Sequence, residues 1–303
     1  MKKMRLGFSD TFGTAISWFA ETFRTRYAVE ICAPEDCDYL IFGDPNFGQE
    51  HYKYRNCKKI LYTGENFRPN YFTYDHAISF DCENSPKHYR LPLWVLELDS
   101  YINDDGFNMY MRSKLKINRD SYMDIHTVID SLQLYNGNRQ APPSYWCSFV
   151  QKNPNNPIRN QFVKQVSKHK EVACGGPLMN NIGRVIPRDI ENKLLFIENY
   201  KFNIAFENGI FPGYETEKIL DGYFAGVVPV YFGSTIIERD FNTNRFINVH
   251  DYTTMDEVVE KMKSLENTMT YMDMLCEPLF KDDLMPHCAS KDLFLDWWET
   301  FVE

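Results

Sequence analysis

Short apolar runs alternate with amphipathic segments along the first part of the chain. Residues 14–25 place apolar side chains at the spacing of a helix. The apolar runs that predict strands are residues 4–9, 27–32, 38–44, 58–66 and 75–81. Alternation of this kind indicates a largely parallel sheet that is covered on both faces.

A more polar stretch, residues 99–139, separates this part from the next one. It ends in YNGNRQAPPS, where Asn-Gly is followed by Pro-Pro, a combination that interrupts regular structure. A chain of 303 residues exceeds the usual size of one hydrophobic core. We therefore predict two domains, residues 1–140 and residues 141–303, with one large α/β domain as the alternative.

The alternation restarts after this stretch. The predicted strands are residues 145–150, 170–174, 201–208 and 227–234, and the predicted helices are residues 157–169, 191–200, 213–226, 255–265 and 291–303. In the last helix, Leu293, Trp297 and Phe301 recur at helical spacing, which predicts that this helix packs on the body, with the N-terminal domain as one candidate surface. The fold class predicted is α/β, with two doubly wound units.

Charge and composition narrow the classes of ligand. The net charge of −9 argues against nucleic-acid binding, so an anionic ligand needs a local basic site. No apolar run reaches the length of about 18 residues that a membrane span needs. We expect a cytoplasmic protein, with the periphery of the inner membrane as the alternative, and eight reduced cysteines.

The first candidate for chemistry is Glu65, in the motif YTGEN. It directly follows the apolar run of residues 58–63, so its carboxylate is predicted at the carboxyl end of a strand, where α/β sheets bind ligands. A carboxylate held there suits a general base. A surface turn, or a cap on a neighbouring helix, is the alternative.

Two further candidates are cations at predicted helix starts. Asn156 is the expected N-cap of one helix, which places Arg159 in its first turn, and Thr216 is the expected N-cap of another, followed closely by Lys218. A cation there opposes the helix dipole by about 0.3–1 kcal/mol unless an anion binds. Two such starts predict a diphosphate site, and a solvent-facing Arg159 is the alternative.

Sequence motifs of several other enzyme classes do not occur in the sequence. It contains no G-x-G-x-x-G, no P-loop, no H-E-x-x-H and no G-x-S-x-G motif. The acidic turns at residues 103–106 and 281–283 are typical of solvated loops more than of metal sites. We therefore expect no tightly bound cofactor and no requirement for a divalent metal.

Four motifs carry a resemblance to a known family. They are YTGEN (62–66), YWCSFVQKNPNNPIRNQF (145–162), CGGPLMNNIG (174–183) and YKFNIAFENGIFPGYETEKILDGYFAGVVPVYFGS (200–234). In their order and spacing they resemble the α-1,3-fucosyltransferases of glycosyltransferase family ten, especially the bacterial enzymes. The last motif is highly specific, whereas YTGEN alone is weak.

The resemblance implies a GT-B architecture, with two Rossmann-like domains facing a central cleft. It further implies an N-terminal acceptor domain, a C-terminal domain for GDP-fucose, and inversion at the anomeric carbon. It assigns the general base to Glu65. The residues that match the donor pocket are Arg159 and Lys218 on the pyrophosphate, with Tyr214, Asn208 and Glu217 on the rest of the donor. An anionic Glu217 near the sugar would also stabilise positive charge that develops on the ring.

The partners implied are GDP-fucose and an oligosaccharide acceptor that contains N-acetylglucosamine, joined in an α-1,3 linkage with 1,4 as the alternative. Two other functions stay open on the residues alone. One is a GT-B glycosyltransferase with another nucleotide sugar. The other is a non-catalytic protein that binds carbohydrate or nucleotide, although a pure binder has no need of a base such as Glu65.

Overall fold

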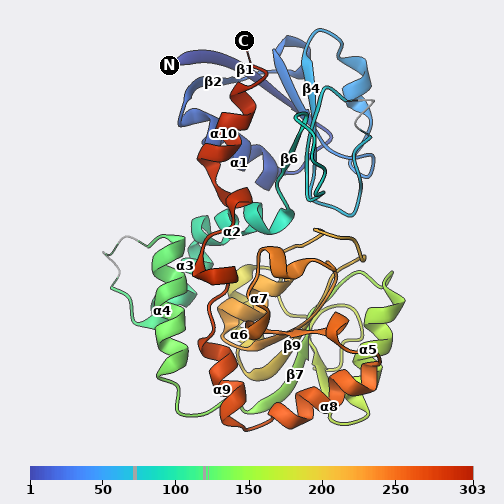
Figure 1. The fold of residues 1–303 in the computed structure, drawn as a ribbon, viewed down its shortest axis with the longest axis vertical. Coiled ribbons are helices and arrows are strands. Elements are labelled where there is room, and N and C mark those ends of the chain that lie inside the picture. The colour runs from blue at the N-terminus through green and yellow to red at the C-terminus, as the bar shows by residue number, and fades with distance from the viewer. Residues whose placement is uncertain (71–73, 119–120, 122, 303) are drawn as a thin grey trace. The chain divides into compact units, whose positions relative to one another are not determined.

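The computed structural model describes residues 1–70, 74–118, 121 and 123–302, which divide into two compact units (Figure 1). Unit 1 comprises Met1–Asp99, Pro212–Glu215 and Met285–Glu303, and unit 2 comprises Ser100–Phe211 and Thr216–Leu284. The first division thus follows Asp99, well before the predicted boundary at residue 140. The C-terminal segment returns to unit 1, the candidate surface named for its helix, and so does the short loop Pro212–Glu215, which no local pattern predicts.

The polar stretch after Asp99 forms helices that pack within unit 2. Helix α4 (Ile125–Gly137) lies against helix α9 (Met269–Cys276). The side-chain amide of Gln133 donates to the carbonyl of Cys276 at 3.0 Å, and that of Asn136 donates to the carbonyl of Leu275 at 3.1 Å. The breaker cluster after α4 is therefore a turn inside unit 2 and does not separate the units.

Unit 1 is built on a six-stranded sheet in the order β2-β1-β3-β4-β5-β6, and all of its strand pairs are parallel, as predicted. Its elements are β1 (Lys2–Ser9), α1 (Gly13–Arg24), β2 (Tyr27–Ile31), β3 (Tyr39–Phe42), β4 (Lys58–Thr63), β5 (His76–Ser79), β6 (His88–Arg90), the first part of α2 (Leu93–Asn103) and α10 (Lys291–Glu299). The strand order reverses between β1 and β3, the kind of position where open α/β sheets bind ligands.

Helix α10 lies beside α1 in unit 1 (Figure 1). Of the predicted stripe, Trp297 and Phe301 are partly buried, and the ring of Phe301 stacks on that of His76 at 3.5 Å, whereas Leu293 is 44% exposed. The fully buried face of the helix was not predicted and consists of Phe294, Leu295 and Trp298. The ring of Phe294 lies 5.3 Å from that of Trp18, and the ring of Trp298 lies 4.4 Å from that of Phe23. Side chains from α1 therefore cover the Phe294 and Trp298 side of α10.

This packing predicts unequal effects of two adjacent substitutions. Phe294→Ala removes a ring that is fully buried and should lower the free energy of unfolding by about 3–5 kcal/mol. Leu293→Ala, on the exposed side of the same turn, is the matched control and should change it by about 0.5 kcal/mol or less. Urea unfolding followed by tryptophan fluorescence measures both. Equal losses for the two variants would contradict the described packing of α10.

Unit 2 has a second parallel sheet, in the order β11-β10-β9-β7-β8. Its remaining elements are α3 (Asp105–Leu115), β7 (Tyr145–Phe149), α5 (Pro157–Ser167), β8 (Val172–Cys174), α6 (Ile190–Ile197), β9 (Tyr200–Phe206), α7 (Lys218–Ala225), β10 (Val228–Phe232), β11 (Ile247–Asn248) and α8 (Met255–Leu265). The order reverses between β7 and β9, so the loops that follow these two strands meet at one end of the sheet.

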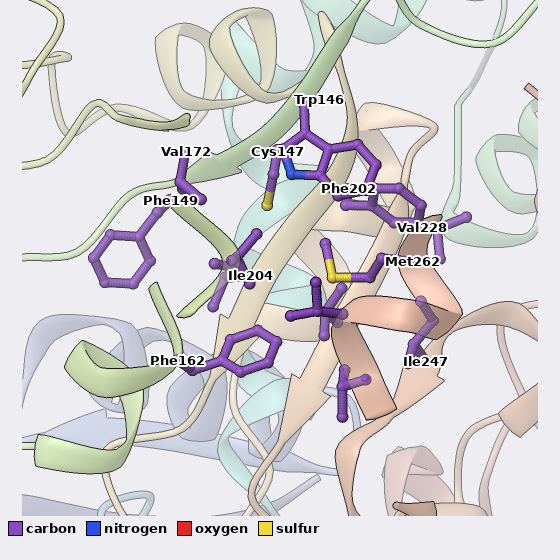
Figure 2. Close-up of a cluster of buried hydrophobic side chains, with 14 of the residues drawn as sticks. Trp146, Cys147, Phe149, Phe162, Val172, Phe202, Ile204, Val228, Ile247 and Met262 are labelled. Carbon is purple, nitrogen blue, oxygen red and sulfur yellow. The ribbon is translucent and has the colours of Figure 1, made fainter. Parts of the chain in front are cut away.

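The core of unit 2 gathers around strands β7 and β9 (Figure 2). Trp146 from β7, Phe202 from β9 and Met262 from α8 lie in one cluster of buried side chains. Phe162 of α5 stacks on Phe206 at the end of β9, with ring centroids 4.7 Å apart. This stacking fixes the start of α5 beside the end of β9.

In the part of the chain that the structure describes, no helix is both long enough and apolar enough to cross a membrane.

Candidate functional site

Glu65 follows the end of β4, as predicted, and lies in unit 1. The hydroxyl group of Tyr214, a residue that is fully buried, donates to Oε2 of Glu65 at 3.2 Å. The carboxylate itself is half-buried, so one of its sides remains open to solvent. Tyr214 was predicted to belong to the donor pocket, and the structure shows that it holds the carboxylate of Glu65.

The backbone under Glu65 is held by two buried residues that sequence reasoning missed. The N–H of Glu65 donates to the hydroxyl oxygen of Thr63 at 3.2 Å, and this hydroxyl donates to Oδ2 of Asp44 at 2.8 Å. Both residues are buried. The turn that carries Glu65 is thus tied to the end of β3, a strand next to the reversal point of the sheet.

Tyr214 reaches unit 1 because residues 212–215 leave unit 2 between β9 and α7. Gly213 has φ +83° and lies so close to the backbone of Phe80 that an added Cβ would be 2.6 Å from its carbonyl oxygen. Two residues later, Glu215 forms a buried ion pair with Arg90 at 3.2 Å. These contacts anchor the loop on both sides of Tyr214 within unit 1.

Arg159 lies in the first turn of α5, as predicted, but its side chain is fully buried. The alternative of a solvent-facing arginine is therefore wrong. Asn156 caps the helix by accepting from the N–H of Arg159 at 3.1 Å. Nη1 of Arg159 donates to the side-chain oxygens of Gln151 and Asn208, at 3.2 Å each, and Nη2 donates to the carbonyl of Asn153. The guanidinium group thus ties the loop after β7 to the loop after β9.

Thr216 does not cap α7, which corrects the prediction. The helix begins at Lys218, and Glu217 occupies the N-cap position without a side-chain capping hydrogen bond. Thr216 is held instead by the fully buried carboxylate of Glu207: its N–H donates to Oε1 at 2.8 Å and its hydroxyl donates to Oε2 at 2.7 Å. A carboxylate is a stronger acceptor than a neutral oxygen, so both donors of Thr216 face it.

Glu207 also joins the two helix starts. The side-chain amide of Asn156, the cap of α5, donates to the carbonyl oxygen of Glu207 at 2.8 Å. Through Thr216, the carboxylate of Glu207 reaches the start of α7. The sequence signal was present, since Glu207 lies beside Asn208 in the FEN motif at the end of an apolar strand. Its burial and its partners come only from the fold.

Lys218 lies between two carboxylates. Its Nζ is 3.3 Å from Oε2 of Glu207 and 3.3 Å from Oε1 of Glu217, and it donates to the hydroxyl of Thr216 at 2.8 Å. Burial disfavours the charged amine, but Glu217 and Glu207 outweigh it and raise the pKa of Lys218. Burial also opposes ionisation of Glu217, yet Lys218 and Lys193 lower the pKa of Glu217 to about 2. Both Glu217 and Lys218 are therefore charged at neutral pH.

The chemistry available at this end of unit 2 is the binding of an anion. Lys218, charged at neutral pH, and the buried guanidinium group of Arg159 lie at the starts of two helices that Glu207 connects. Burial raises the pKa of Glu207. No group of three or more His, Cys, Asp or Glu side chains that could hold a metal ion occurs among the residues described.

Comparison with known families finds matches in both halves of the chain. Residues 5–97 match the model of the α-(1,3)-fucosyltransferase FucT N-terminal domain. Residues 139–275 match the model of the C-terminal part of glycosyltransferase family 10, the fucosyltransferases. The second match contains Arg159, Glu207 and Lys218, and the first contains Glu65.

Individual relatives agree with these models. The chain is 34% identical to the α-(1,3)-fucosyltransferase FucT of Helicobacter pylori over 261 residues, 83% of this chain and 54% of the relative, so it spans about half of that protein's length. It is 33% identical over 118 residues to α-(1,3)-fucosyltransferase B of Drosophila melanogaster, covering 35% of this chain and 26% of that one.

Solved structures extend the similarity to nearly the whole chain. A crystal structure of an α1,3-fucosyltransferase with GDP-fucose matches with a TM-score of 0.76 and 28% identity, and one with GDP matches with a TM-score of 0.78 and 28% identity. Each match covers 99% of this chain and 90% of the other. The predicted α/β fold class of GT-B type is confirmed. The chain belongs to glycosyltransferase family 10, the fucosyltransferases.

Proposed function

We propose that this protein transfers L-fucose from GDP-fucose to a hydroxyl group of an oligosaccharide that contains N-acetylglucosamine, with inversion and in an α-1,3 linkage. The observation that carries the proposal is Lys218, charged and buried at the start of α7, in a chain similar to a fucosyltransferase crystallised with GDP-fucose. Unit 2 binds the donor in this proposal, and unit 1 binds the acceptor.

The chemistry needs a base and a stabilised leaving group. Glu65 takes the proton from the acceptor hydroxyl, and the oxygen forms a bond to the anomeric carbon of fucose as the bond from that carbon to GDP breaks. GDP leaves with the electron pair of that bond, and its diphosphate gains negative charge. Lys218 and Arg159 supply the positive charge that stabilises it, without a divalent metal.

The other site residues follow from this scheme. Arg159 reaches the diphosphate by exchanging a neutral partner, such as the side-chain oxygen of Gln151 or Asn208, for a phosphate oxygen. Glu217, 26% exposed and ionised, accepts hydrogen bonds from donor hydroxyls and stabilises positive charge on the sugar ring. Tyr214 positions Glu65. The cytoplasmic location, with peripheral contact to the inner membrane as the alternative, stays a prediction.

One assay tests the function. The protein is incubated with GDP-fucose and N-acetyllactosamine, and GDP release and fucosylated product are measured by mass spectrometry. Product formation supports the proposal. Transfer from another nucleotide sugar, in parallel reactions without GDP-fucose, would replace it with the second enzyme hypothesis. GDP binding without transfer to any acceptor of a broad panel would favour a non-catalytic binding protein, and absence of both would overturn the proposal.

A further inference from the structure

A second buried lysine lies beside α7, outside the site residues that the sequence indicated. Lys193 is on α6, and its Nζ is 2.6 Å from Oδ2 of Asp221 on α7. The other oxygen of Asp221 accepts a short hydrogen bond from the hydroxyl group of the buried Tyr101. The side chain of Lys193 is 21% exposed and that of Asp221 is 5% exposed. The ion pair therefore has one side close to solvent.

Glu217 and Asp221 lie one helical turn apart on α7. The N–H of Asp221 donates to the carbonyl oxygen of Glu217 at 3.0 Å, and residues four apart project from the same side of a helix. Lys193 interacts with both carboxylates: burial disfavours its charge, but Asp221 and Glu217 outweigh this and raise its pKa. One lysine on α6 therefore compensates two acidic side chains on α7.

Lys193 limits the excess of negative charge at the start of α7. Two cations, Lys193 and Lys218, face three carboxylates, those of Glu207, Glu217 and Asp221. If Lys193 is removed, Glu217 loses one of the two lysines that compensate its charge and depends on Lys218. Its ammonium group is then held more tightly by its own protein and is less available to an incoming anion.

We propose that Lys193 is a positioning residue of the donor site: it holds the carboxylate of Glu217, and thereby leaves Lys218 available for the diphosphate. This inference rests on the proposed function, because it names the residue that prepares the same site. Lys193 acts through Glu217 and Lys218, and no contact of its own with the reacting atoms is required.

The test is calorimetric titration of GDP into a series of variants, with thermal unfolding as a check on the fold. Lys193→Met should weaken GDP binding about tenfold, the size of coupling expected between charges in one network. Lys193→Arg keeps the charge and should bind GDP within about threefold of the unchanged protein. Lys261→Met, which removes a lysine from α8 on another part of unit 2, is the matched control and should leave GDP binding unchanged.

Two double variants separate positioning from a purely structural role. In Lys193→Met/Glu217→Gln the competing carboxylate is gone, so Lys218 is released and GDP affinity should recover to that of the single variant Glu217→Gln, which is measured alongside. In Lys193→Met/Asp221→Asn both charges of the ion pair are removed, so no unpaired buried carboxylate remains and thermal stability should recover. GDP binding should stay weak. A structural role predicts the reverse: rescue of GDP binding by Asp221→Asn and none by Glu217→Gln.

The outcomes also distinguish this inference from the proposed function. If the unchanged protein does not bind GDP, both are overturned. If it binds GDP and Lys193→Met binds equally well, or if only Asp221→Asn restores binding, the role of Lys193 is overturned and the proposed function stands. Weak binding by Lys193→Met together with rescue by Glu217→Gln supports the inference.

Discussion

Glu65→Gln is expected to lower kcat for fucose transfer by about 10²–10⁴-fold, the usual contribution of a positioned general base. The amide can still accept the hydrogen bond from Tyr214, so the turn after β4 keeps its shape, but it cannot take the proton of the acceptor hydroxyl. The affinity for GDP should not change, because Lys218 and Arg159 belong to unit 2 and Glu65 to unit 1. Steady-state kinetics and calorimetry measure the two effects separately.

A matched control removes a carboxylate elsewhere in the same unit. Glu35→Gln changes an exposed glutamate in the short helical turn Pro34–Asp36 and should leave kcat as it is. Tyr214→Phe removes the hydroxyl group that donates to Glu65 but leaves the base in place. Its loss of kcat should therefore lie between those of Glu35→Gln and Glu65→Gln. Transfer by Glu65→Gln within about threefold of the unchanged protein would remove Glu65 from the mechanism.

Lys218→Met is expected to weaken GDP binding by about 10- to 100-fold, the contribution of a hydrogen-bonded charge. It also leaves the fully buried carboxylate of Glu207 without its lysine, which should cost about 3–5 kcal/mol of unfolding free energy at neutral pH. Burial already raises the pKa of Glu207, and this carboxylate takes up a proton more readily once the lysine is gone. The loss of stability should therefore shrink as the pH falls.

The double variant Lys218→Met/Glu207→Gln separates binding from stability. It removes both charges of the buried pair, so the unfolding free energy should recover. GDP binding should stay weak because the ammonium group of Lys218 is still missing. Calorimetry with GDP and urea unfolding measure the two quantities, and Lys261→Met serves as the control for loss of a positive charge. Full recovery of GDP affinity in the double variant would show that Lys218 acts only on the fold.

Much of the fold could be predicted from local pattern. The apolar runs of β1, β4, β7 and β9 are strands because parallel strands, covered on both faces, need continuous apolar segments. The same kind of run placed Glu65 at the end of β4. Asn156 caps α5 because a short polar side chain before Pro157 can satisfy the free N–H groups of the first turn. All of these depend on neighbours in the sequence.

What the sequence alone determined is therefore where the elements lie and which polar residues stand at their ends. Only the tertiary structure decided that Tyr214 meets Glu65, 149 positions away, and that Lys193 pairs with Asp221 across two helices. It also turned Thr216 toward the buried carboxylate of Glu207 and away from its expected capping role. The physical reason is that periodicity and capping are local, whereas the pairing of buried charges depends on the path that loops take between distant elements.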